Sequence, residues 1–110
     1  MTIDKATLAQ AIRDADDAAR ARTKGRTDDG GSCNFDTAYI QFPKGTRKAA
    51  IEAVAAETGI RLYPHYYYKS AWFVDVHMPG QGNLRTEAAR AACESLRRSG
   101  FEAHMYYRVD

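Results

Sequence analysis

Residues 60–78, which read IRLYPHYYYKSAWFVDVHM, give the clearest indication of the fold. They contain two runs rich in aromatic and β-branched residues, 60–69 and 71–78, and such runs are typical of strands. Only Ser70 separates the runs, so the sequence predicts two strands joined by a tight turn. Pro64 lies inside the first run, and proline is tolerated at the edge of a sheet rather than in a central strand. We therefore expect an edge strand followed by a central one.

A strand and a helix precede this hairpin, and a helix and a strand follow it. Residues 35–42 (FDTAYIQF) have strand composition, and apolar residues recur at helical spacing over 46–58. The same spacing predicts a helix over 84–99, and 101–109 again has strand composition. A glycine follows each helix, as is common at helix ends. The resulting order is β-α-β-β-α-β.

This order predicts an α+β fold of the ferredoxin-like kind. In that fold a four-stranded antiparallel sheet has the order 4-1-3-2 and two helices cover one face. Residues 2–22 add an alanine-rich N-terminal helix, and residues 23–33 (TKGRTDDGGSC) are expected to form a flexible loop. We expect one domain over 1–110, with its ferredoxin-like core over 34–110.

Composition argues for an ordinary globular domain. Of the 110 residues, 45% are hydrophobic and 27% charged, and the net charge of +2 is too small to indicate nucleic-acid binding by itself. No apolar run approaches the ~20 residues of a membrane span, and no secretory leader is evident. Cys33 and Cys93 do not form a disulfide framework. We therefore expect a cytoplasmic protein that does not enter a membrane.

Alternation along the strands predicts one apolar face under the helices and one face rich in aromatic and histidine side chains. The candidates for partner binding on this second face are Tyr39, Tyr63, Tyr67, Phe73, His77, His104 and Tyr106. Tyr66 falls on the helix-covered face. An exposed aromatic patch of this size usually marks a partner. Two alternatives stay open: the N-terminal helix covers the patch, or two copies of the chain join through it as a homodimer.

Two basic, glycine-containing segments precede the later helices: 44–47 (KGTR) and 79–85 (PGQGNLR). With the first and third strands taken as parallel, both segments fall at the same end of the sheet. Free N–H groups at such helix starts can hold an anion, and we single out Lys44, Arg47 and Arg85 there. Neither segment has a Walker or dinucleotide fingerprint, so simple helix capping remains the alternative.

No strong catalytic or metal motif is evident. With parallel first and third strands, Cys33 and His77 would lie about 25 Å apart, too far for a nucleophile and its base. His77 and His104 would lie at the same end of the sheet with a strand between them, and no ligand spacing indicates a metal site. Cys93 lies on the apolar stripe of a helix and is expected in the core. We expect no enzymatic activity, no cofactor and no metal.

The order of elements is similar to that of the RNA-recognition motif, which stacks bases on aromatic residues of its first and third strands. Tyr39 and Phe73 stand at positions that match those aromatics. Ala71 and Val76 stand where the family has two further aromatics, which weakens the match. The resemblance implies binding of single-stranded RNA or DNA.

Three blocks resemble small uncharacterised proteins carried by bacterial mobile genetic elements: 28–36 (DDGGSCNFD), 80–83 (GQGN) and 106–110 (YYRVD). That resemblance implies an accessory role, such as binding and blocking a host machine, and brings no catalytic residues. We therefore expect a small binding module with a protein partner. Single-stranded RNA or DNA is the alternative ligand, and a small enzyme or ligand-binding domain with an anion site at the helix starts comes third.

Overall fold

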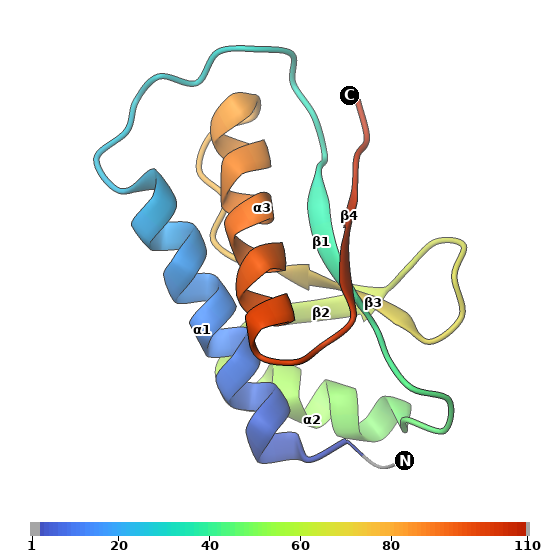
Figure 1. The fold of residues 1–110 in the computed structure, drawn as a ribbon. Coiled ribbons are helices and arrows are strands. Elements are labelled where there is room, and N and C mark those ends of the chain that lie inside the picture. The colour runs from blue at the N-terminus through green and yellow to red at the C-terminus, as the bar shows by residue number, and fades with distance from the viewer. Residues whose placement is uncertain (1–2, 110) are drawn as a thin grey trace.

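The computed structural model describes residues 3–109, which form three helices and four strands (Figure 1). In chain order these are α1 (Lys5–Thr23), β1 (Thr37–Gln41), α2 (Lys48–Thr58), β2 (Arg61–Pro64), β3 (Ala71–Asp75), α3 (Asn83–Arg98) and β4 (Ala103–Tyr106). Every predicted helix and strand is present, although the strands are shorter than predicted. The predicted start of the first helix, residue 2, lies outside the described residues.

The four strands form one antiparallel sheet in the order β2-β3-β1-β4. Read from the other edge, this is β4-β1-β3-β2, the order that the sequence predicts. Ala38 of β1 lies opposite Val74 of β3 on one side and Met105 of β4 on the other. β2 pairs only with β3, so Pro64 lies in an edge strand, where its missing N–H costs no ladder hydrogen bond.

β1 and β3 run in opposite directions, so the expectation that they are parallel is wrong. β1 and β2 are both antiparallel to β3. After the crossover through α2, β2 therefore runs in the same direction as β1, and the hairpin reverses the chain direction in β3. As a consequence, α3 begins near the start of β1, whereas α2 begins beyond its end. The two basic segments therefore lie at opposite ends of the sheet.

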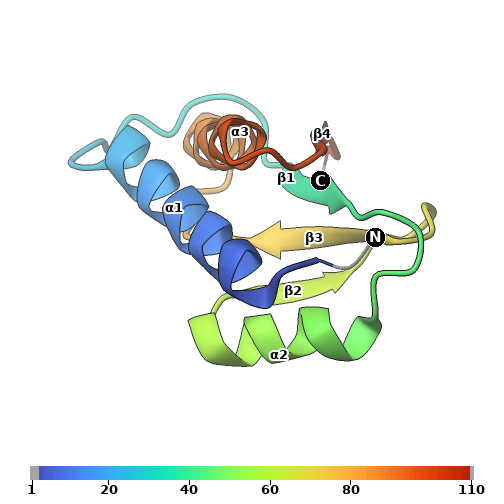
Figure 2. The same ribbon diagram turned by 60° about the horizontal axis from the view of Figure 1, so that its bottom comes forward.

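The N-terminal helix α1 lies on the same side of the sheet as α2 and α3 (Figure 2). It packs mainly against α3 and also against α2. Asp4 caps its start by accepting the N–H of Ala6 (3.2 Å). Its apolar stripe is buried in the main core: Leu8, Ala9, Ala11, Ile12, Ala15 and Ala19. α1 therefore does not cover the aromatic face of the sheet.

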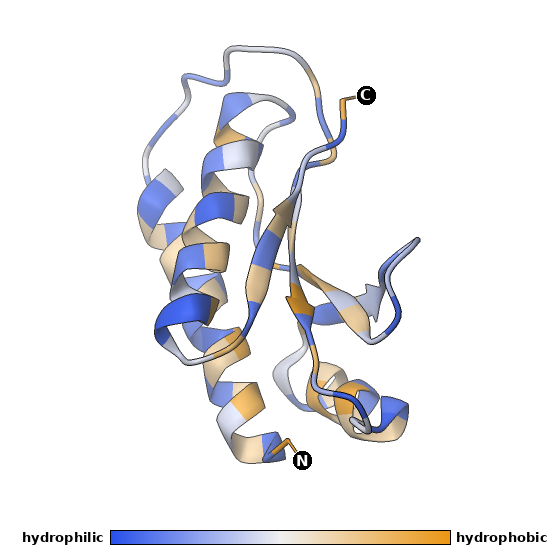
Figure 3. Cartoon of the chain, turned by 45° about the vertical axis from the view of Figure 1, so that its right-hand side comes forward, coloured by the Kyte–Doolittle hydropathy of each residue, from blue (hydrophilic) through white to orange (hydrophobic). Residues whose placement is uncertain are grey.

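The main core lies between the three helices and one face of the sheet. Its strand residues are those that alternation predicts there: Ala38, Ile40, Leu62, Trp72, Val74 and Ala103. Hydrophobic and hydrophilic residues alternate along the helices and strands, as this two-sided arrangement requires (Figure 3). None of the helices formed by residues 3–109 has the length and apolar character that crossing a membrane requires.

Candidate functional site on the aromatic face of the sheet

The connection between β2 and β3 is a loop over residues 65–70 rather than a tight turn. It is anchored at both ends, because the N–H of His65 donates to the carbonyl of Ala71 and the N–H of Phe42 donates to the carbonyl of Ser70 (2.8 Å each). Ser70 has a φ of 61°, a left-handed conformation that turns the chain into β3. The loop curls away from the helices (Figure 1). The predicted second strand therefore ends early.

His65 in this loop covers the centre of the aromatic face. Its ring stacks on Phe73 (ring centroids 4.7 Å apart, 14° between planes) and on Tyr68 (4.5 Å, 26°). Tyr39 and Tyr106 contact the same imidazole edge to face, at 4.7 and 5.1 Å. Phe73 is consequently 1% exposed and Tyr39 9% exposed. The aromatic face thus forms a second, smaller core that is roofed by its own hairpin loop.

The hydrogen bonds of His65 fix its protonation state. Its Nδ1 accepts the N–H groups of Tyr67 (3.0 Å) and Tyr68 (3.3 Å), so this nitrogen carries no proton. Burial lowers the pKa of His65, which favours the neutral ring. The proton of that ring is therefore on Nε2, a buried atom that has no hydrogen-bond partner within residues 3–109.

Beside this cluster the sheet face holds a cavity of about 200 Å³. Its lining residues are Phe35, Thr37, Tyr63, Tyr66, Phe73, Arg85, Tyr106 and Arg108. Phe35 and Tyr66 are about half exposed, and Tyr67, which contacts both Tyr66 and Tyr106, is 75% exposed. We call the following residues the tyrosine–arginine surface: Phe35, Tyr66, Tyr67, Tyr106, Arg85 and Arg108.

Two arginines approach this cavity from different elements. Arg85, in the first turn of α3, donates from Nη2 to the hydroxyl of Thr37 (3.2 Å). Arg108, which follows β4, has its guanidinium carbon 5.6 Å from the ring centroids of both Phe35 and Tyr66. The guanidinium carbon of Arg85 lies 6.0 Å from the same Phe35 ring. Within residues 3–109, neither arginine forms an ion pair.

The buried carboxylate of Asp36 fixes the wall of the cavity. One of its oxygens accepts the backbone N–H of Arg108 and the other accepts the hydroxyl of Thr86 (2.8 Å each). These bonds tie the segment after β4 and the start of α3 to the segment before β1. The backbone segments that carry Arg85 and Arg108 are therefore fixed in position by hydrogen bonds to Asp36.

The structure brings together five of the residues that the sequence singles out: Tyr63, Tyr67, Phe73, Arg85 and Tyr106. Tyr39 and His104 lie next to this group, with ring centroids 5.6 Å apart. The Nε2 of His104 is 3.0 Å from a carboxylate oxygen of Glu102. Tyr66 was expected on the helix-covered face but contacts Phe73 on the aromatic face, because it lies in the loop and strand alternation does not apply there.

Three other predicted residues lie elsewhere. Lys44 and Arg47 are exposed beyond the end of β1, at the end of the sheet opposite Arg85. His77 was expected on the aromatic face but lies beside α1, where its N–H donates to Asp16 (2.8 Å). The reason is that β3 ends at Asp75, so the strand alternation that placed His77 no longer holds.

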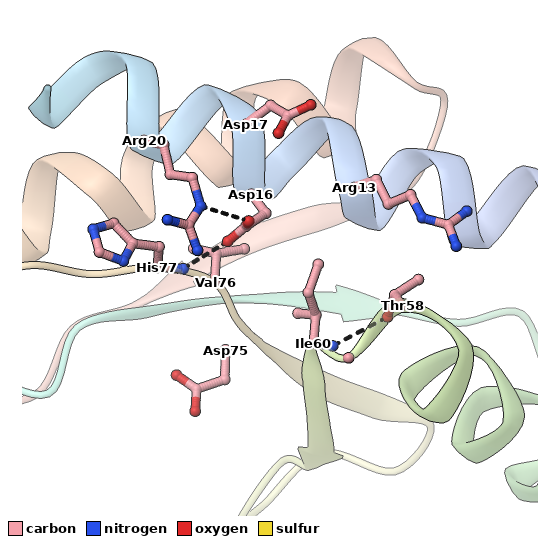
Figure 4. A pocket seen from close by; sticks show the side chains of 10 residues that line it. Arg13, Asp16, Asp17, Arg20, Thr58, Ile60, Asp75, Val76 and His77 are labelled. Atoms are coloured by element: carbon pink, nitrogen blue, oxygen red, sulfur yellow. Dashed lines mark hydrogen bonds and ion pairs between the residues drawn. The ribbon is translucent and has the colours of Figure 1, made fainter.

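His77 borders a larger cavity, of about 510 Å³, between α1 and the ends of β3 and α2 (Figure 4). Asp16 accepts hydrogen bonds there from Arg20 (2.9 Å) and from the backbone of His77. Burial raises the pKa of Asp16, but these two hydrogen bonds outweigh it and hold the pKa below its usual value. Because the three carboxylates and two arginines that line this cavity leave only one net negative charge, it makes a weaker candidate site than the tyrosine–arginine surface.

The glycine-rich segment before α3 does hold an anion, but the anion is the chain's own Asp29. The carboxylate accepts N–H groups from Gln81 (2.7 Å), Gly82 (3.1 Å) and Leu84 (3.1 Å). The bonds from Gln81 and Leu84 lower the pKa of Asp29 most. Gly80 has a φ of 77°, and a side chain there would collide with this carboxylate. The expected cradle is therefore filled, and the 23–33 loop is tied to α3; the mobility of that loop stays a prediction.

The antiparallel strands also change the position of Cys33. It lies at the same end of the sheet as the end of β3, with its Sγ 3.6 Å from Oε1 of Gln81, so the 25 Å separation argued from parallel strands does not hold. For the same reason His77 and His104 do not share an end of the sheet: His104 is level with Tyr39 and Phe73 in its middle, and His77 lies beyond the end of β3. In the part of the chain from residue 3 to 109, no three His, Cys, Asp or Glu side chains are grouped as a metal ion requires.

Comparison with protein-family models, with curated proteins and with solved structures finds no match to this chain.

Proposed function

We propose that this protein is a non-enzymatic binding module that holds a protein partner on the tyrosine–arginine surface. The proposal places this surface on a ferredoxin-like fold, which the β-α-β-β-α-β core and the strand order β4-β1-β3-β2 support. It also keeps the accessory role in a mobile genetic element that the sequence blocks imply, in which the protein modulates or blocks its partner.

The observation that carries the proposal is the exposure of three large aromatic side chains on the tyrosine–arginine surface. Phe35, Tyr66 and Tyr67 are 47%, 54% and 75% exposed. Burying their apolar area against a partner would stabilise the complex by about 25 cal/mol per Å². Tyrosine and arginine are the residues that most often dominate binding energy at protein interfaces. The aromatic patch and its arginines therefore have the composition of an interface centre.

The surface is also held in place before any partner arrives. Tyr66 packs on Phe73, with ring centroids 5.1 Å apart, and Arg108 lies over the rings of Phe35 and Tyr66. Side chains that are already ordered lose less conformational entropy when they bind, so more of the contact energy appears as affinity.

Binding of single-stranded RNA or DNA is the second candidate function. One observation weighs against direct stacking of bases on Tyr39 and Phe73. Tyr39 and Phe73, the residues that match the base-stacking aromatics of the RNA-recognition motif, lie beneath His65 and Tyr68. A base would reach them only after the hairpin loop moved away. This favours the protein partner.

Site-specific photo-crosslinking in a lysate of the source cells tests the proposal. A photoreactive phenylalanine replaces Tyr67 in one variant and Ala56, on the exposed side of α2, in a matched control. We expect a discrete adduct with another protein at position 67 and none at position 56. Once identified and purified, that protein should bind the wild-type chain at least tenfold more tightly than Arg108→Glu.

Other outcomes overturn the proposal. Equal labelling at both positions, or none, would remove the surface as the partner site. An adduct of the chain with itself would make the surface a homodimer contact, which light scattering at increasing concentration would verify. A gel shift of a labelled single strand that is lost with salt and with Arg108→Glu would assign the surface to nucleic acid instead.

A further inference from the structure

We propose that the cavity beside Phe35 binds a single oxyanion, a carboxylate or phosphate, carried on an aromatic residue of the partner. This deepens the proposed function, on which it rests, by naming the group that the surface receives. The cavity of about 200 Å³ equals the volume of roughly six or seven liquid waters at ~30 Å³ each. One ring with its anionic group is of that order, and a larger ligand would have to extend outside.

The side chain of Arg85 holds a hydrogen-bond donor that lacks an acceptor among the described residues. Arg85 uses Nη2 to bond Thr37, but its Nε is buried and has no partner within residues 3–109. A buried donor without an acceptor is unfavourable, and more so when the group is charged. After a rotation of the Arg85 side chain that turns Nε toward the cavity, a carboxylate or phosphate there would supply the missing acceptor in the geometry that guanidinium groups favour.

Two cationic side chains face this cavity, and neither forms an ion pair with another of the described residues. The guanidinium carbons of Arg85 and Arg108 lie 6.0 and 5.6 Å from the centroid of the same Phe35 ring, so two like charges share one wall of the cavity. The nearby carboxylate of Asp36 bonds Thr86 and a backbone N–H rather than either guanidinium. Both guanidinium groups therefore remain available to an anionic ligand, which would offset the repulsion between them.

The remaining walls of the cavity are aromatic. The rings of Phe35, Tyr63, Tyr66, Phe73 and Tyr106 line the cavity. Burial raises the pKa of Tyr63 and of Tyr106, so both stay protonated phenols and add hydroxyl donors but no negative charge. Aromatic walls with cationic donors at one end favour a flat ring that carries an oxyanion over a free ion or a neutral ring.

Titration of the purified, full-length protein with four small probes tests this inference: phenyl phosphate, 3-phenylpropionate, inorganic phosphate and phenol. Binding is followed by calorimetry and by the NMR signal of the arginine Nε–H groups. We expect saturable binding of phenyl phosphate, of 3-phenylpropionate or of both, and at least tenfold weaker binding of inorganic phosphate and of phenol. Whichever of phenyl phosphate and 3-phenylpropionate binds more tightly shows whether the cavity prefers a phosphate or a carboxylate.

Charge-removing variants place the binding in the cavity. We expect Arg85→Gln and Arg108→Gln each to weaken the better probe about tenfold, and the matched control Arg47→Gln, an exposed arginine at the other end of the sheet, to leave it unchanged. Thermal unfolding verifies that Arg85→Gln folds; if it does not, the exposed Arg108 carries the test alone.

Three results would overturn the inference: no saturable binding of either ring-bearing anion, equal binding of inorganic phosphate, or equal weakening by Arg47→Gln. These results leave the crosslinking outcome at position 67 untouched, so the cavity and the wider partner surface fail or succeed separately.

Discussion

At the scale of single residues, His65 shows how one side chain converts an exposed aromatic face into a second core. It is sandwiched between Phe73 and Tyr68, and its Nδ1 accepts two backbone N–H groups of its own loop. The loop is therefore held over the sheet by a neutral imidazole. Protonation would remove the acceptor and place a charge among aromatic rings.

Stability is expected to depend on pH through His65. Because burial lowers the folded-state pKa below the usual 6.5, the unfolded chain binds a proton first as the pH falls. Stability is therefore full above about pH 6.5 and declines below it until the folded-state pKa is passed. Urea unfolding followed by the fluorescence of Trp72, at about pH 7.5 and pH 5.5, measures this decline.

The His65→Phe variant keeps a ring in the stack and removes the titration, so its stability should change little between these two pH values. His104→Gln, which changes the histidine beside Glu102, should keep the wild-type decline. A decline that persists in His65→Phe would contradict this assignment.

Asp29 is the second residue with a distinct structural effect, because its carboxylate closes the N-terminus of α3. Asp29→Asn should destabilise the fold more than Asp28→Asn, since Asp28 bonds the side chain of Arg26 and no helix N–H. The hydrogen bonds lower the pKa of Asp29, so its contribution is present above about pH 3.8 and is lost as the pH falls through the folded-state value. Guanidinium unfolding at pH 7 and near pH 3 measures both effects.

The asparagine variant should lose less stability than the wild type between these pH values, because it has no carboxylate to protonate. Equal effects of Asp29→Asn and Asp28→Asn at pH 7 would show that the cap contributes nothing.

At the scale of elements, α1 is part of the main core rather than a cover for the aromatic face. Its stripe of small residues faces α3, whose buried residues include Ala88 and Ala92, and small side chains let two helices approach closely. The face that α1 leaves open is covered instead by residues 65–70, a segment that the sequence predicts mostly as strand.

This packing predicts a large cost for Ile12→Ala. Ile12 is fully buried, and removing a buried isoleucine side chain to alanine typically costs about 2–5 kcal/mol in the free energy of unfolding. Gln10→Ala, an exposed position on the same helix, should change it by less than about 0.5 kcal/mol. Urea unfolding compares the two. Similar small values would mean that α1 contributes little to the core.

At the scale of the whole molecule, the alternating pattern of the sequence predicts both faces of the sheet but not what lies on them. Residues such as Ile40 and Val74 face the helices as expected, because alternation is a local property of a strand. The alternating pattern predicts the wrong positions for Tyr66 and His77, because both lie outside the strands, where that periodicity ends. The candidate site depends most on these irregular segments, so it was predicted only in part.

Spacing and composition act over a few residues, and they were enough to predict the type and order of the helices and strands, the edge position of β2 and the apolar side of the sheet. Three other features follow from the tertiary packing instead: the place of α1, the cover of aromatic rings around His65 and the binding of Asp29 at the start of α3. The tertiary packing also places Arg85 and Arg108 beside the ring of Phe35. Each of these features depends on contacts between residues far apart in the chain. Antiparallel strand pairing and shared burial bring those residues together, and a local sequence pattern cannot predict such contacts.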